Sequence, residues 1–201
     1  MIVGQDMKMI SGLSAALRRV SVTALSVVAL LPAVAAPAHA VSADSAADLQ
    51  TFRAEALGAH NTYRMRHGVP RLALSDRLNA YAQEWADKLA AKDEFKHRPD
   101  GSYGENLYYA WNPSASFRVS GNAPVKSWYD GVKDYGGIYD RDPTDQEFPK
   151  VGCFTQVVWM STRLMGIGYA VSASHRHYVV ADYDPTGNMM GEFAANVPRP
   201  R

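Results

Sequence analysis

Three side chains of this sequence have the types and spacing for metal or acid–base chemistry. His97 and Glu105 lie eight residues apart on either side of a glycine-containing segment, and Cys153 is the one cysteine of the chain. An imidazole and a carboxylate that converge across a turn can ligate a metal ion together, or the carboxylate can orient the imidazole as a base. The spacing equally fits a surface histidine and a turn glutamate, so both interpretations stay open.

Cys153 has a functional and a structural interpretation. As a thiolate it can ligate zinc, or act as a nucleophile with His97 as its base and Glu105 as the orienting carboxylate. As a neutral thiol it behaves as a small buried hydrophobe beside Phe154. The first interpretation makes the protein a hydrolase, and the second leaves the thiol inert.

The other histidines are weaker candidates. His60 borders an apolar helical stripe, and we expect it to be buried against Tyr63 or a backbone carbonyl. His67 lies at the end of the same helix, where a cation is favourable. His175 and His177 are expected to be exposed in a hairpin.

An aromatic stretch supplies a candidate ligand groove. Tyr108, Tyr109 and Trp111 fall on one predicted strand, and Trp111 opens a loop that can leave an aromatic ring exposed. The same residues also fit the core and rim of a sheet. We predict weak binding of a lipid-like ligand beside them.

Three helices are predicted from apolar residues that recur at intervals of three and four. The first runs from Leu49 to Gly68, and the second from the N-cap Ser75 to about Lys92. The third begins at Asn122 and continues through Tyr135.

Strands are predicted at 106–111, 164–171 and 177–183, with residues 172–175 as a hairpin connection. Residues 153–160 fit both a strand and a short helix. Helices and strands interleave without a regular βαβ rhythm, which favours an α+β sandwich over a doubly wound sheet.

The composition fits one globular domain and excludes several classes of protein. The chain has 201 residues, of which 47% are hydrophobic, and 21 Lys and Arg nearly balance 20 Asp and Glu. A net charge of +1 lacks the basic excess that nucleic-acid binding needs, so we expect no nucleic-acid partner. A single cysteine cannot close an intramolecular disulfide, so packing alone must hold the fold.

The N-terminal segment has the pattern of a secretory signal peptide. Lys8, Arg18 and Arg19 form a basic region, a mostly apolar run follows at 20–31, and Ala38–Ala40 is a small-x-small cleavage site. The apolar run is shorter than the ~20 residues of a membrane span, so we do not expect a transmembrane anchor.

The predicted organisation follows from this leader. We expect residues 1–40 to be removed and the mature chain to be secreted, with Met7 as an alternative start. Residues 41–48 are predicted as a small polar spacer, 49–198 as one domain and 199–201 as a tail.

Four segments, taken in order, resemble the CAP superfamily, whose SCP domain occurs in cysteine-rich secretory proteins, antigen 5 proteins and plant pathogenesis-related proteins. They are Ala59–Arg64 with His67–Pro70, Gly104–Leu107, Gly152–Trp159 and Tyr183–Asn188. The resemblance runs from about residue 50 to 197. Without disulfides, the chain is most similar in type to Golgi-associated and bacterial members.

The resemblance implies a three-layer α-β-α sandwich with a shallow cleft, in which two His and two Glu can hold a divalent metal. His97 matches the first histidine and Glu105 the first glutamate, whereas the positions of the second glutamate and second histidine are Gly131 and Cys153. We expect Gly131 to leave space for a ligand, and Asp134 to substitute partly for the missing carboxylate. The incomplete site is expected to bind zinc weakly.

These observations together predict a secreted, non-catalytic binding module for a lipid, a sterol-like molecule or another extracellular component. Weakly bound zinc is the one candidate cofactor. The alternatives are a thiol- or metal-dependent hydrolase that uses Cys153, His97 and Glu105, and a defence-related surface protein that acts by recognition alone.

Overall fold

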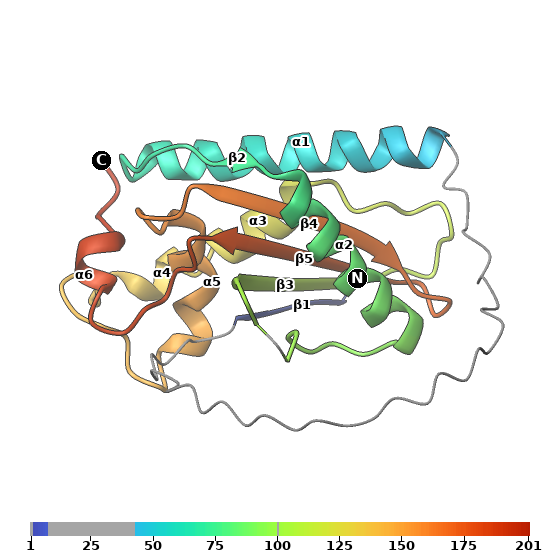
Figure 1. Cartoon of the computed structure of the whole chain (residues 1–201). Helices are drawn as coiled ribbons and strands as arrows, with labels where there is room; N and C mark the ends of the chain where they lie inside the picture. Colours follow the sequence, from blue (N-terminus) through green and yellow to red (C-terminus); the bar gives the residue numbers. More distant parts are fainter. Residues whose placement is uncertain (1, 8–42, 100) are drawn as a thin grey trace, which may run out of the picture.

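A five-stranded sheet lies between helices on its two faces (Figure 1). The computed structural model describes residues 2–7, 43–99 and 101–201. The strands are β1 (Ile2–Met7), β2 (Ala73–Leu74), β3 (Gly104–Trp111), β4 (Leu164–Val171) and β5 (Arg176–Asp184). The helices are α1 (Ala43–Arg66), α2 (Asp76–Lys92), α3 (Asn122–Tyr129), α4 (Val132–Tyr135), α5 (Phe148–Val158) and α6 (Phe193–Asn196).

The sheet has the strand order β1-β3-β5-β4-β2. The pairs β1–β3, β3–β5 and β5–β4 are antiparallel, and the short β2 pairs parallel with the start of β4. On one face, Trp85 and Leu89 of α2 pack against Leu107 of β3. The opposite face carries the larger core, in which Trp128 of α3 and Phe154 of α5 are fully buried. This arrangement confirms the predicted α+β sandwich.

Two glycines of β4 let α2 approach the sheet closely. A Cβ at Gly168 would lie 2.5 Å from Gln83 Cα, and a Cβ at Gly166 would overlap the backbone of Leu78. Any other residue at these two positions would push α2 away from the sheet. The alternation of β4, with glycine on one face and larger residues on the other, therefore sets how α2 docks.

Polar side chains of α2 cover the outer edge of β4 beyond its pairing with β2. Asn79 Oδ1 accepts a hydrogen bond from the Ile167 N–H at 3.0 Å, and Gln83 Oε1 accepts one from the Tyr169 N–H at 3.1 Å. Gln83 Nε2 also donates to the Tyr169 carbonyl at 2.9 Å. These bonds satisfy backbone groups that an edge strand otherwise leaves open to pairing with another chain.

The guanidinium of Arg64 is buried near the C-terminal end of α1. Its Nε donates to the Pro70 carbonyl at 2.7 Å. Its terminal nitrogens donate to the carbonyls of Val157, Trp159 and Thr162 at 3.0, 2.9 and 3.0 Å. Carbonyls at the end of a helix have no partner within that helix, so Arg64 satisfies the end of α5 from outside. Burial lowers the pKa of Arg64 to about 10, so it stays charged at neutral pH.

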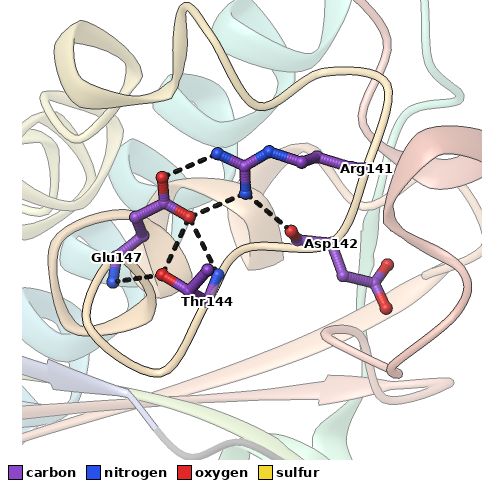
Figure 2. A network of polar contacts seen from close by, with 4 residues as sticks. All are labelled: Arg141, Asp142, Thr144 and Glu147. Carbon is purple, nitrogen blue, oxygen red and sulfur yellow. Dashed lines mark hydrogen bonds and ion pairs between the residues drawn. The ribbon is translucent and has the colours of Figure 1, made fainter.

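Four residues of the loop between α4 and α5 hold the start of α5 (Figure 2). Glu147 Oε2 accepts a hydrogen bond from the Thr144 N–H at 2.8 Å, and Thr144 Oγ1 accepts one from the Glu147 N–H at 3.3 Å, as in a capping box. Arg141 donates to both carboxylate oxygens of Glu147 at 2.7 Å and to the Asp142 carbonyl at 2.9 Å. The hydrogen bonds from Arg141, and then those from Thr144, lower the pKa of Glu147 to about 2.

Several predicted elements are confirmed, two need correction, and one open case is decided. The second helix, its Ser75 cap and the strand at 164–171 agree with the structure. Residues 43–48, predicted as a spacer, are the first turns of α1, since alanine-rich sequence favours helix. The predicted helix at 122–135 is divided into α3 and α4 on either side of Gly131. The ambiguous segment at 153–160 is helical through Val158.

No pattern in the sequence predicts the strands β1 and β2. β2 has only two residues, too few for a periodic pattern. β1 pairs along β3 from Ile2 opposite Trp111 to Met7 opposite Asn106, and it lies inside the predicted signal peptide. The rest of that predicted segment, from residue 8 to 40, lies outside the described residues, so its removal stays a prediction.

We predict that Arg64→Lys destabilises the protein by about 2 kcal/mol or more, because one ammonium group cannot serve four carbonyls spread around a planar guanidinium. The matched control is Arg66→Lys, an exposed position two residues further along α1, where a change within about 0.5 kcal/mol is expected. Urea unfolding of both variants measures this. Equal stability of the two variants would contradict the role given to Arg64.

We predict that Glu147→Gln lowers stability at pH 7 and that this loss shrinks as the pH falls. The pKa of Glu147 in the folded protein is about 2, below its ordinary value of 4.5. Its contribution is therefore complete above about pH 4.5 and is lost as the pH falls through about 2. Urea unfolding at pH 7 and at about pH 3 tests this, with Asp145→Asn, an exposed carboxylate in the same loop, as the control. A difference between Glu147→Gln and wild type that does not change with pH would refute it.

Candidate functional site

His97 and Glu105 meet where the chain passes from α2 into β3. His97 Nδ1 lies 2.6 Å from Glu105 Oε1, and the Arg98 N–H donates to the same oxygen at 3.0 Å. As a carboxylate oxygen, Glu105 Oε1 accepts both hydrogen bonds, so His97 Nδ1 is the donor of the His97 contact. The Glu105 side chain is 4% exposed and the His97 side chain 17% exposed. The structure thus brings these two predicted residues together.

Arg98 contacts α2 and so holds the loop that contains His97 against this helix. Its guanidinium lies 3.7 Å from the centroid of the Tyr81 ring and donates to the Tyr81 carbonyl at 2.6 Å. It also pairs with Glu84 at 2.6 Å. These contacts place His97 and Glu105 on the face of the sheet that α2 covers.

Cys153 belongs to the opposite face. It lies on α5, is 5% exposed and packs in the larger core with Phe154. Asn106, the neighbour of Glu105 on β3, donates to the Cys153 carbonyl at 3.1 Å. Successive residues of a strand point to opposite faces, so Glu105 points away from the side on which α5 lies. The predicted set of Cys153, His97 and Glu105 is not assembled, and Cys153 fits its structural interpretation.

Gly131 does not leave space for a ligand, which corrects the expectation from the sequence. A Cβ at this position would lie 2.7 Å from the Lys150 carbonyl oxygen and 3.2 Å from Phe154 Cβ. The close approach of α5 therefore accounts for the glycine. Asp134, the suggested substitute carboxylate, is exposed on α4.

The residues present do not fit the metal centre that the resemblance implies. Within the described ranges, no group of three or more His, Cys, Asp and Glu side chains is arranged to hold a metal ion. Glu105 Oε2 is buried and has no hydrogen-bond partner among the described residues. His97 and Glu105 thus remain as a pair, and the other two positions do not contribute.

His60 joins α1 to the sheet as a neutral imidazole. Its Nδ1 donates to the Ala56 carbonyl at 2.8 Å, so its Nε2 accepts a hydrogen bond from the Tyr183 hydroxyl at 2.8 Å. Asn106 Nδ2 donates to the same hydroxyl oxygen at 3.4 Å. Burial lowers the pKa of His60 to about 4. The predicted bond to a backbone carbonyl is confirmed, with Tyr183 rather than Tyr63 as the side-chain partner.

Two other histidines correct the predictions made for them. His67 is buried and bonds to the Pro198 carbonyl at 2.7 Å and the Tyr129 hydroxyl at 3.0 Å. Desolvation lowers its pKa, so the charged form is disfavoured despite the nearby helix end. His177 is 1% exposed and bonds to Tyr169, whereas the neighbouring hairpin residue His175 is half-buried.

The last two family-like segments bind each other inside the core. Thr155 Oγ1 lies 2.5 Å from Asn188 Oδ1, and Asn188 Nδ2 donates to the Gly152 carbonyl at 2.9 Å. Gln156 Oε1 accepts a hydrogen bond from the Gly187 N–H at 3.0 Å. These motif residues hold α5 against the chain after β5, which is a structural role.

The aromatic stretch does not form the predicted groove. Tyr108 is 3% exposed and packs in the larger core, whereas Tyr109 lies on the other face against Phe95. Trp111 is 38% exposed, and its Nε1 donates to the Ser174 carbonyl at 3.0 Å. Strand alternation thus puts Tyr108 on the opposite face of the sheet from Tyr109 and Trp111, so the three side chains do not line one groove.

A hollow of about 620 Å³ lies elsewhere, between α1, α2, the end of β4 and residues 118–120. Its floor is the stacked pair of Phe52 and Tyr169, whose ring centroids are 5.0 Å apart. A smaller hollow of about 460 Å³ shares Ala170 and Val171 with it. We call the larger hollow the α1–α2 groove; its lining residues are Asp48, Leu49, Thr51, Phe52, Glu55, Gln83, Asp87, Arg118, Val119, Ser120, Tyr169, Ala170 and Val171.

The patterns in the sequence do not predict this groove. Phe52 belongs to the apolar stripe of the first predicted helix, and Tyr169 to the larger-residue face of a predicted strand. The groove forms because α1 packs beside β4. These two elements are far apart in the sequence: Arg53 and Ile167, which share a hydrogen bond, are 114 residues apart, so no local pattern can reveal their contact.

Comparison with known proteins identifies the family. The profile of the CAP domain, described as the cysteine-rich secretory protein family, matches residues 57–183. Golgi-associated plant pathogenesis-related protein 1 of Homo sapiens is 38% identical over 155 residues, which cover 75% of this chain and 94% of the relative. Pathogenesis-related protein 1A of Nicotiana tabacum is 39% identical over 145 residues, or 71% and 80% of the two chains. The chain therefore belongs to the CAP family, as the four segments indicated.

A solved structure supports the fold. The crystal structure of NaASP2 with Zn²⁺ aligns with a TM-score of 0.61 at 24% identity and covers 75% of this chain and 87% of that one. The family description names secretory proteins, whereas the human relative is Golgi-associated by name. Among the residues that the structure describes, no helix is long and apolar enough to cross a membrane.

We predict that Gly131→Ala destabilises the protein by about 1–3 kcal/mol, because the added methyl group would collide with α5. Gly136→Ala is the matched control: its backbone is also helical, and nothing lies within 4 Å of an added Cβ. Removal of a glycine there is expected to be neutral, or stabilising by about 0.5 kcal/mol. Thermal unfolding of the two variants tests this, and a Gly131→Ala variant as stable as Gly136→Ala would show that the site has free space.

Proposed function

We propose that this protein is an exported, non-catalytic binding module that takes the apolar part of an amphipathic, lipid-like ligand into the α1–α2 groove. The observation that carries the proposal is the groove itself, about 620 Å³ over the Phe52–Tyr169 pair. Ligand sites in proteins are typically concave, mostly apolar and about 300–1,000 Å³ in volume. Leu49, Val119 and Val171 supply further apolar lining.

The separation of Cys153 from His97 and Glu105 favours binding over catalysis. A nucleophile needs its base within hydrogen-bond reach, and here the thiol lies in the core on the other face of the sheet. The His97–Glu105 pair has the orientation of a base and its carboxylate but no nucleophile among these predicted partners. The hydrolase alternative therefore has no geometric support.

Export is supported by the pattern at residues 1–40 and by membership of a family described as secretory. Mass measurement of the protein released by its own cells tests this part. A mass that includes residues 1–40 would overturn it.

We predict that Ala170→Trp abolishes saturable binding of dodecyl maltoside, a neutral amphiphile, by filling the groove. About six buried methylene groups at ~0.8 kcal/mol each give a dissociation constant on the order of 0.1–1 mM for the wild type. The control is Ala195→Trp, an exposed alanine of α6 outside the groove. Isothermal calorimetry below the critical micelle concentration measures both. Unchanged binding in Ala170→Trp would place the ligand elsewhere.

A further inference from the structure

The charged side chains that line the α1–α2 groove are mainly acidic. Asp48 of α1 and Asp87 of α2 are exposed at the groove, and Glu55 of α1 is half-buried. Among the described lining residues, Arg118 is the one cation. Three carboxylates therefore face one guanidinium around an apolar floor.

Two of the charged lining residues, Arg118 and Glu55, already form hydrogen bonds with backbone groups of residues 115–121. Arg118 Nη1 donates to the carbonyls of Ala115 and Phe117 at 2.9 and 2.8 Å, which holds it against its own loop. Glu55 Oε2 accepts a hydrogen bond from the Gly121 N–H at 2.7 Å. Asp48 and Asp87 are the exposed carboxylates of the lining, so a ligand can reach them from solvent.

Asp87 has a central position along the apolar surface. It lines both the α1–α2 groove and the smaller hollow that shares Ala170 and Val171 with it. Gln83 Nε2 donates to Asp87 Oδ1 at 2.9 Å and orients the carboxylate on α2. A ligand whose chain lies over Tyr169 and Ala170 thus passes this carboxylate.

We infer that the α1–α2 groove selects a cationic amphiphile, that is, an ammonium or guanidinium group joined to an apolar chain. This inference rests on the proposed function and adds the charge of the ligand head group. Asp48 and Asp87 attract a cationic head from either side of the groove, while Phe52, Tyr169 and Val171 bury the chain. A carboxylate or phosphate head would meet the same acidic residues and be repelled.

The electrostatic effect is large enough to measure. One unit charge about 4 Å from a head group in water changes affinity about five-fold. Because the Debye length falls from roughly 10 Å at 0.1 M salt to roughly 3 Å at 1 M, the preference for a cation must weaken with added salt. The contribution of the apolar chain does not share this dependence.

The test compares three amphiphiles whose chains have about twelve carbons and whose head groups differ in charge: dodecyltrimethylammonium, dodecyl maltoside and dodecanoate. Calorimetric titration at low salt, below each critical micelle concentration, is expected to give dodecyltrimethylammonium the highest affinity and dodecanoate the lowest. In the Asp48→Asn, Asp87→Asn double variant the affinity for the cation should fall about ten-fold or more, with the maltoside unaffected. Asp134→Asn, an exposed aspartate of α4 outside the groove, is the control.

The outcomes separate the two proposals. Equal affinities for the three heads, a preference for dodecanoate, or a cation preference that survives in the double variant each overturn the inference about charge and leave the binding function intact. Absence of saturable binding for all three amphiphiles overturns the proposed function together with it. Circular dichroism of the double variant verifies that its fold is unchanged.

Discussion

The buried guanidinium of Arg64 is the interaction on which the arrangement of this protein depends. It is the point where α1, the turn after it and the end of α5 meet, through four backbone carbonyls. A buried cation is costly unless its hydrogen-bonding capacity is used, and an orphaned carbonyl is costly for the same reason. Each therefore stabilises the other. With the end of α5 held in this way, Thr155 and Gln156 can reach the chain after β5.

Arg64 is part of a polar line along the inner face of α1. His60 lies one turn before it and His67 one turn after it, and both rings join a carbonyl to a tyrosine hydroxyl. Burial lowers the pKa of each imidazole, so both act as neutral connectors rather than as acids or bases. The histidines of the first family-like segment thus serve packing. Of the family-like segments, Gly104–Leu107 contributes the one carboxylate, Glu105, that faces α2 beside His97.

The two faces of the sheet divide the chemistry of the molecule. The face under α2 holds His97 and Glu105, while the opposite face holds Cys153 in a core of aromatic and aliphatic side chains. The thiol of Cys153 and the His97–Glu105 pair therefore lie on different faces of the sheet. The α1–α2 groove lies instead beside the outer edge of β4, where α1 and α2 both contribute lining residues. Binding at that position requires nothing from the residues that resemble a metal site.

The sequence by itself determined most of the elements and the family, because these depend on local periodicity and on short motifs. It left open whether His97 and Glu105 meet. It did not determine all of the inner face of α1, since a buried charged residue such as Arg64 does not stand out in a hydrophobic pattern. It also left open whether Cys153 lies with Glu105, and it grouped Tyr108 with Tyr109. Only the tertiary structure decided these points: the alternation of β3 puts neighbours on opposite faces, and the packing of α1 beside β4 creates the groove from residues distant in the chain.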